Sequence, residues 1–237
     1  MKDEGGRRRT GADRSRVSSF SLHPSALPRW YRRLLAVYGP QGWWPGRTPF
    51  EVAVGAILTQ NTAWTNVEKA IANLKAAGAL SFRGMKRLPE RTLAALIRPS
   101  GYFNQKAKKL RAFLAWLEAR GGKSGSVRRA LAGPLGEVRE SLLAVHGVGP
   151  ETADSILLYA GDRPVFVIDA YTRRVLSRHG MPRATDAPYD ELRALFESGL
   201  PRSVRLYNEF HALLVRLGKE RCRKRGPRCA ECLLRRT

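Results

Sequence analysis

The strongest constraint on the fold is a helical pattern that runs into Gly147-Val148-Gly149 and is followed at once by a second helix, which Pro150 can begin. Two glycines one residue apart allow positive φ and a close approach of the backbone. The free N–H groups of the second helix would then point outward and could hold a phosphate without reading a base. Val148 would anchor the turn in the core. A plain helix–helix hairpin with a glycine C-cap explains the same residues, so the segment alone leaves both interpretations open.

The rest of the sequence has helical rather than strand periodicity. Thr48-Pro49-Phe50-Glu51 is a capping box that opens an apolar helix through Leu58. Apolar residues at helical spacing predict further helices over 64–77, 88–97, 106–119, 137–145, 150–159, 169–179, 188–197 and 203–218. Only the apolar run 165–168 could be extended. The patterns predict an all-α fold of about ten short helices.

The net charge points to a polyanionic partner. The 237 residues carry 43 Lys and Arg against 20 Asp and Glu, a formal charge of +23. Residues 1–16 hold +3 of this charge and residues 219–237 hold +6, so +14 remains on the body and the excess is not confined to the two ends. Nucleic acid is the first candidate for the partner. No segment approaches the roughly 20 apolar residues that span a bilayer, and the polar, Arg-rich start does not resemble a signal peptide.

Asp169 is the most informative single carboxylate. It follows four apolar residues and precedes a helical pattern, which is the position of an ordinary N-cap. A carboxylate at a helix N-terminus also stays ionised and can be directed into a cleft. There it could stabilise a positively charged sugar or activate a water molecule, the two tasks in cutting an N-glycosidic bond.

Three segments in order resemble the helix-hairpin-helix glycosylase superfamily, typified by endonuclease III. The first is the run Leu-x-x-Val-x-Gly-Val-Gly-x-x-Thr-Ala at 142–153, followed by Val-Ile-Asp at 167–169. The second, residues 55–62, resembles the family segment whose Gln enters the duplex beside the flipped nucleotide. The third is residues 100–107. The resemblance covers roughly residues 28 to 232.

The resemblance implies two helical lobes with DNA in the cleft between them. One lobe would be a six-helix barrel of residues 41–163 that ends in the hairpin. The other would combine 20–40 with 164–237, and 1–19 would form a disordered basic arm. Asp169 would be the catalytic carboxylate. The implied DNA contacts are Gln60, Asn61, Lys106, Gly147, Val148, Gly149 and Thr152. The alternatives are a polar helix C-terminus for Gln60 and Asn61 and a solvated face for Lys106.

Glu151 is the departure that matters most. Endonuclease III has a lysine at this position of the hairpin, and that lysine forms a Schiff base with the sugar. Glu151 cannot form an imine. We therefore expect a glycosylase without efficient lyase activity, unless a neighbouring lysine supplies the amine, and Glu151 is kept as a catalytic candidate beside Asp169.

Aromatic residues favour one branch of the family. Gly42-Trp43-Trp44-Pro45 and Gln60-Asn61-Thr62-Ala63-Trp64 look most like the 3-methyladenine DNA glycosylase III branch, in which aromatics at the positions of Trp44 and Trp64 sandwich the base. Trp43 and Pro45 would complete the pocket. An N-methylated purine is cationic, and stacking on indole would favour it by roughly 1–2 kcal/mol when desolvated. The alternative is that these tryptophans belong to the core.

Three cysteines lie close together near the end of the sequence. Cys222, Cys229 and Cys232 have the spacing of the iron–sulfur loop of endonuclease III, whose fourth cysteine follows after five more residues. The resemblance implies a possible [4Fe-4S] cluster with three of its four ligands in this chain, through truncation or degeneration of the site. Zinc with an outside histidine is a weaker alternative. The 3-methyladenine branch lacks this loop, so the sequence mixes two patterns.

Three functions therefore stay open. The first is a glycosylase that excises an alkylated purine from double-stranded DNA. The second is an endonuclease III-like glycosylase and AP lyase for oxidised pyrimidines, favoured by the cysteines and opposed by Glu151. The third is a non-catalytic DNA-binding module, opposed by Asp169. We expect a monomer in a bacterial-type cytosol, near the nucleoid.

Overall fold

The computed structural model describes residues 22–43 and 46–235, and all regular structure in these residues is helical. The α-helices are α1 (Leu27–Tyr38), α2 (Pro49–Leu58), α3 (Trp64–Ala76), α4 (Phe82–Arg87), α5 (Glu90–Leu96), α6 (Phe103–Gly121), α7 (Val127–Ala130), α8 (Leu135–Leu143), α9 (Pro150–Ser155), α10 (Ala170–Arg178), α11 (Tyr189–Gly199) and α12 (Val204–Glu220). A π-helix, η3 (Ile156–Ala160), continues α9. The all-α prediction is confirmed. Helices α1, α4 and α7 were not expected; α4 and α7 are too short to show a helical period.

Side-chain caps fix several helix starts where the sequence places them. Thr48 accepts a hydrogen bond from the backbone N–H of Glu51 at 3.1 Å, as the capping box predicts. Ser203 caps α12 in the same way, accepting from the N–H of Leu206 at 3.3 Å. The boundaries of α2 and α12 therefore follow from local chemistry.

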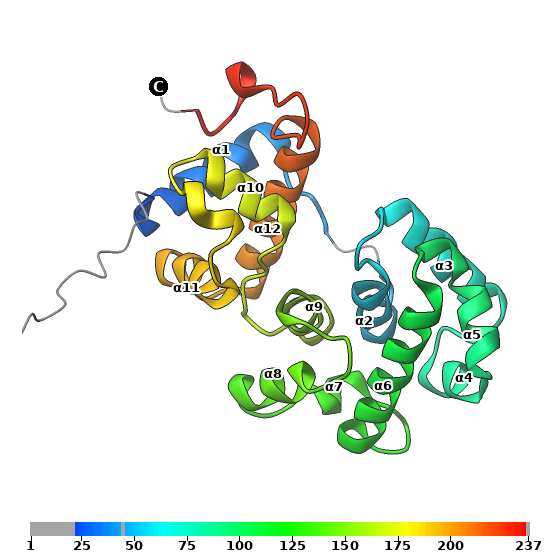
Figure 1. Ribbon diagram of the computed structural model, residues 1–237. Helices are drawn as coiled ribbons and strands as arrows, with labels where there is room; N and C mark the ends of the chain where they lie inside the picture. The colour runs from blue at the N-terminus through cyan, green and yellow to red at the C-terminus, as the bar shows by residue number, and fades with distance from the viewer. Residues whose placement is uncertain (1–21, 44–45, 236–237) are drawn as a thin grey trace, which may run out of the picture.

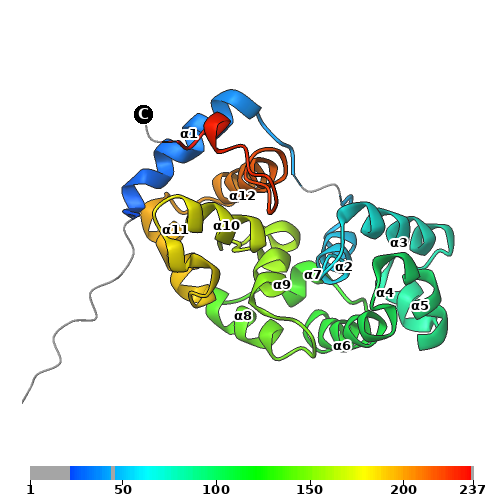
Figure 2. The same ribbon diagram turned by 45° about the horizontal axis from the view of Figure 1, so that its top comes forward.

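The helices form two lobes (Figure 1). Helices α2 to α6 gather on one side, whereas α1, α10, α11 and α12 gather on the other, with α8 and α9 between them. The view in Figure 2 shows the same division, with α1 beside the C-terminal segment. Segments from both ends of the described chain thus build one lobe. The residue boundaries predicted for the lobes stay a prediction, and the predicted arm at 1–19 lies outside the described residues.

The apolar run 165–168 is extended but has no strand partner among the described residues. Side chains of α11 satisfy its backbone instead. Phe166 N–H donates to the Glu197 carboxylate at 3.0 Å, and Ile168 N–H donates to the Tyr189 hydroxyl at 3.2 Å. Below it, the Phe166 ring stacks on Phe196 with centroids 4.0 Å apart. This buried, hydrogen-bonded segment fixes the position of the next residue, Asp169.

Candidate active site

The predicted hairpin joins α8 to α9. Gly147 has φ of +77°, and a Cβ at this position would collide with the side chain of Lys109. Gly149 is extended, with φ −91°, and a Cβ there would meet nothing within 4 Å. Val148 is buried, as expected. Only Gly147 therefore needs the conformational freedom of glycine, whereas Gly149 leaves open space before the first turn of α9, where a phosphate could approach.

Gln60 ties the hairpin to the end of α2. Its amide nitrogen donates to the Gly147 carbonyl at 3.0 Å and to the Thr152 hydroxyl at 2.9 Å. Lys109 donates to the amide oxygen at 2.5 Å. Entry of Gln60 into a duplex would have to break these bonds, so its wedge role stays a prediction. Asn61, exposed and with φ of 54°, lies beside it without that constraint.

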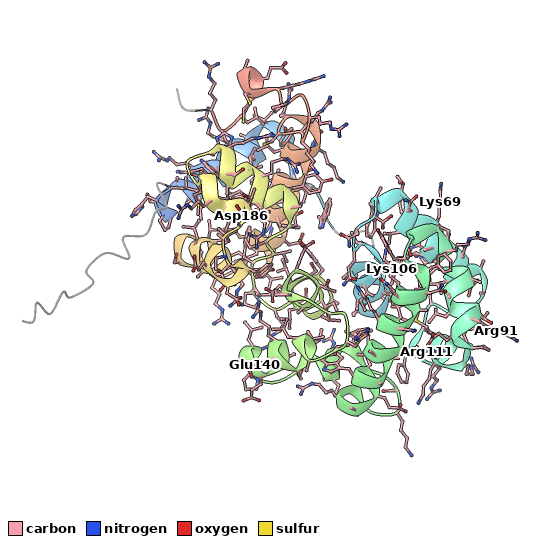
Figure 3. All side chains as sticks on the ribbon, viewed as in Figure 1. Lys69, Arg91, Lys106, Arg111, Glu140 and Asp186 are labelled. Carbon is pink, nitrogen blue, oxygen red and sulfur yellow. The ribbon has the colours of Figure 1, made fainter. Side chains whose placement is uncertain are left out.

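Lys106 is buried in the lobe of α2 and α6, which opposes the predicted DNA contact. It is 2% exposed, and its ammonium donates to the carbonyls of Leu58 at 2.8 Å and Ser100 at 2.7 Å. Figure 3 labels it where α6 lies beside α2. Burial, and then the charge of Lys109, lowers the pKa of Lys106 to about 8. The side chain caps the end of α2 from inside the lobe and cannot reach a phosphate.

Asp169 caps α10 and also faces a cavity. One carboxylate oxygen accepts a hydrogen bond from Thr172 N–H at 2.7 Å, and the other lies 3.5 Å from Nε2 of His211. The side chain is 13% exposed. Burial acts to raise the pKa of Asp169, but the interactions with His211 and Thr172 outweigh it, so the pKa lies below its usual value. The N-cap interpretation is therefore correct, and the same contacts keep the carboxylate ionised.

Glu151 lies at the mouth of the same cavity, on the first turn of α9. Burial of its carboxyl group, and then the charge of Asp169, raise the pKa of Glu151 to about 7, against opposing effects of His211 and Arg173. The residue as a whole is exposed, so water in the free protein screens these effects. A DNA duplex over the mouth would remove that water and add negative charge, which would raise this pKa further. Two neighbouring carboxyl groups thus have pKa values shifted in opposite directions.

The cavity measures about 320 Å³, within the range of small-molecule sites. Trp43 and Trp64, both half-buried, are in its wall. Lys219 from α12 also lines it and lies 5.6 Å above the ring of Trp43. Trp44 and Pro45, predicted for the same pocket, lie outside the described residues. The structure therefore brings two of the four predicted aromatic-pocket residues to Asp169 and Glu151.

Besides Lys219, sequence reasoning missed His211 and Tyr159 at this site. His211 lies on the buried face of α12, 4% exposed, with its Nδ1 atom 2.5 Å from the Tyr159 hydroxyl. The signal was present in the sequence: a histidine interrupts an otherwise apolar helix face between Phe210 and Leu214. A polar side chain there requires buried partners.

The three cysteines meet at a second cavity, of about 1100 Å³, in the lobe of α1 and α12. Cys222 is buried, Cys232 half-buried and Cys229 exposed, and His179 Nε2 lies 3.4 Å from the sulfur of Cys232. Six arginines line the same cavity: Arg29, Arg33, Arg178, Arg221, Arg228 and Arg235. Such a lining favours an anionic occupant. Within the described residues, no three Cys, His, Asp or Glu side chains are close enough to hold one metal ion.

No helix in ranges 22–43 and 46–235 has the length and apolarity to cross a membrane.

The comparisons with known proteins agree with this geometry. Residues 54–202 match the HhH-GPD superfamily of base excision DNA repair proteins. The protein named "Putative DNA repair glycosylase MJ1434" of Methanocaldococcus jannaschii is 46% identical over 202 residues, covering 85% of this chain and 90% of that protein.

Solved structures are similar as well. The crystal structure of H.pylori 3-methyladenine DNA glycosylase (MagIII) bound to 1,N6-ethenoadenine superposes with a TM-score of 0.71 and 29% identity, over 84% of this chain and 98% of that one. A non-covalent endonuclease III–DNA complex gives a TM-score of 0.74 at 20% identity, over 90% and 94% of the two chains, which shows the fold alone. The chain belongs to the HhH-GPD superfamily and is a DNA glycosylase of base excision repair.

Proposed function

We propose that this glycosylase excises an alkylated purine by hydrolysis, with Asp169 as the catalytic carboxylate and without efficient lyase activity. The observation that carries the proposal is the ionised Asp169 in the wall of a cavity of about 320 Å³ that also contains Trp43 and Trp64. A flipped base in that cavity would bring its sugar to the carboxylate.

The two carboxyl groups suit two different steps. As the bond between the sugar C1′ and the base nitrogen breaks, the electron pair leaves with the base and positive charge develops on the sugar, which the Asp169 carboxylate stabilises. Water then adds to C1′ and gives a proton to Glu151. The raised pKa of Glu151, about 7 before a duplex covers the site, makes its ionised form a stronger proton acceptor than an ordinary carboxylate. The products are the free base and an intact abasic strand.

A cationic alkylated purine suits the pocket for two reasons. Its glycosidic bond is already weak, so no acid has to protonate the departing base. Indole faces attract cations, and the structural relative MagIII is a 3-methyladenine DNA glycosylase. Lys219 already covers one face of Trp43, so a cationic base would have to stack on the other face or on Trp64.

The absence of efficient lyase activity follows from the amines available. Glu151 replaces the family lysine in the hairpin and has no amine. Lys219 is the lysine that lines the cavity in the described part of the chain. Any residual imine with the sugar would therefore form on Lys219.

The test is base release from duplexes that each carry one lesion: 3-methyladenine, 1,N6-ethenoadenine, uracil opposite guanine, or thymine glycol. Each reaction is run with and without hot alkali, which breaks abasic sites. We expect purine release with strand cuts only after alkali, and no release by Asp169→Asn. Release of uracil or thymine glycol alone would refute the substrate. Direct strand cutting with borohydride trapping would refute the monofunctional mechanism and support the endonuclease III-like alternative.

We also propose that the cysteine cavity holds an iron–sulfur cluster bound by Cys222, Cys229 and Cys232. The support for a cluster is that the three cysteines, which have the spacing of the endonuclease III iron–sulfur loop, all line one cavity. The arginine lining favours the negative charge of the cluster. The cluster would join α12 to the following loop and would take no part in the reaction. The monomeric state and the cytosolic location stay predictions.

A further inference from the structure

His211 connects the candidate catalytic carboxylate to a tyrosine on another helix. Its Nε2 atom lies 3.5 Å from one oxygen of Asp169, and its Nδ1 atom lies 2.5 Å from the Tyr159 hydroxyl. The second oxygen of Asp169 accepts the Thr172 N–H at 2.7 Å. Asp169 is thus held on both oxygens, one by the start of α10 and the other by the imidazole of α12.

The chemistry of Tyr159 determines where the imidazole proton sits. Burial, and then the charges of Asp169 and Glu151, hold the pKa of Tyr159 well above its usual value, so the phenol keeps its proton. When the His211 ring is neutral, the protonated phenol donates to Nδ1. The ring must then carry its own proton on Nε2, the nitrogen that faces Asp169. Within the described residues Nε2 is buried and makes no hydrogen bond of ordinary geometry, and the Asp169 oxygen lies 3.5 Å from it.

The backbone brings Tyr159 to this position by an irregularity. Helix α9 passes into the π-helix η3 at Ile156, three residues before Tyr159. A residue added to a helical turn changes the direction of the following side chains by about 100°. Packing of η3 against α12 brings the phenol to His211. The π-helix and the buried histidine belong to different helices, and they meet at the contact between the Tyr159 hydroxyl and Nδ1 of His211.

We propose that Tyr159 and His211 are positioning residues that keep Asp169 ionised and directed at the sugar, with Tyr159 selecting the His211 tautomer that presents Nε2–H to the carboxylate. The proposal rests on the role of Asp169 proposed above. The other charged groups at the site are Glu151 on α9, Arg173 on α10 and Lys219 on α12.

Loss of the histidine has a defined consequence. Asp169 would remain mostly buried but would keep only the Thr172 N–H as a donor. Its pKa would rise, and a larger fraction would be protonated at mildly acidic pH. A protonated carboxyl group does not stabilise a cationic sugar. The rate should therefore fall, and should fall most on the acidic side of its pH profile.

The test compares His211→Ala, His211→Gln and Tyr159→Phe with the wild type. The control is Tyr207→Phe, because Tyr207 is a buried phenol on α12 whose ring packs on Phe166 rather than on the site. Single-turnover base release is measured from pH 5 to 9 on the best substrate found above, with enzyme in excess. Affinity for the damaged duplex and thermal stability are measured separately.

We expect H211A to be about 10- to 100-fold slower, as for loss of one hydrogen bond to a charged group, with affinity for the duplex changed less than about twofold. The acidic limb should move by roughly one pH unit toward neutrality. H211Q should recover part of the rate, since its amide can donate to Asp169. Y159F should move the acidic limb of the pH–rate profile in the same direction by a smaller amount. The double variant of Y159F and H211A should be no slower than H211A alone.

A stably folded H211A with the wild-type rate and acidic limb would overturn the proposal. So would stability losses in H211Q and Y159F with unchanged pH profiles, because such losses indicate packing alone. If H211A does not fold, H211Q and Y159F decide between these outcomes. Asp169→Asn is measured in parallel. An active D169N would refute the role of Asp169 itself. An inactive D169N together with an H211A of wild-type activity would refute only the positioning role of Tyr159 and His211.

Discussion

The ion pair between Arg139 and Asp154 should be the most damaging polar contact to break. Arg139 on α8 donates to both carboxylate oxygens of Asp154 on α9, at 2.7 and 3.2 Å, and also to Asp190 on α11 at 2.8 Å. Asp154 has no exposed side-chain surface, and Arg139 has 12%. The pair therefore joins both helices of the hairpin to the other lobe from a buried position.

The cost of breaking it follows from this burial. Burial raises the pKa of Asp154 although Arg139 opposes it, while the pKa of Arg139 is raised despite its own burial, chiefly through Asp154. The ion pair thus stabilises the charged form of Arg139. It does not fully offset the cost of removing the Asp154 carboxylate from water, as is usual for buried ion pairs. Arg139→Met leaves that carboxylate without its ion-pair partner. We expect a loss of about 3–5 kcal/mol, or about 6–20 °C in Tm for a chain of this size.

The assay is urea unfolding at pH 7 and pH 5, followed by circular dichroism. Asp154 has a folded pKa above its unfolded value, and still higher in R139M, so the folded variant binds the extra proton. Its stability relative to the wild type should therefore recover as the pH falls from 7 to 5. Arg139→Met with Asp154→Leu should lose less than R139M alone. Asp190→Asn is the exposed control, with an expected loss below about 1 kcal/mol.

A loss for R139M of less than about 1 kcal/mol at pH 7, or a double variant less stable than R139M, would refute this reasoning. A small loss for R139M would mean that water reaches Asp154 in the variant, whereas a less stable double variant would mean that the Asp154 carboxylate keeps stabilising contacts without Arg139.

Three further predictions concern the active-site base, the hairpin and the cysteine cavity. Glu151→Gln should remove the rise in single-turnover rate expected from about pH 7 upward, because the pKa of Glu151 is about 7 in the free protein and higher under a bound duplex; a profile identical to the wild type would exclude Glu151 as the base. Gly147→Ala should lower the free energy of unfolding by about 1–2 kcal/mol because of the positive φ, and by more because the new Cβ meets Lys109. Gly149→Ala should leave the thermal stability unchanged and weaken binding to an undamaged duplex. Cys222→Ser should lower the iron and sulfide content of the purified protein, while unchanged iron content would contradict the cluster.

The helical fold and several of its boundaries were predictable because local chemistry decides them. The capping box at Thr48, the positive φ of Gly147 and the N-cap position of Asp169 depend on neighbours within a few residues. The apolar period does the same for the longer helices. Helices α4 and α7 escaped prediction because one or two turns give too little period to detect.

The sequence by itself determined an all-α chain with a glycine hairpin, a carboxylate at a helix start and a large positive charge, since each is a local or compositional property. Only the tertiary structure decided which side chains share an environment. Lys106 is buried inside a lobe, although its sequence neighbours suggest a solvated face. Gln60 is hydrogen-bonded to the hairpin through the Gly147 carbonyl. The tertiary structure also joined Tyr159, His211 and Asp169 through contacts that span 52 and 42 positions of the chain. Such contacts depend on how helices pack, and no periodicity within one helix contains that information.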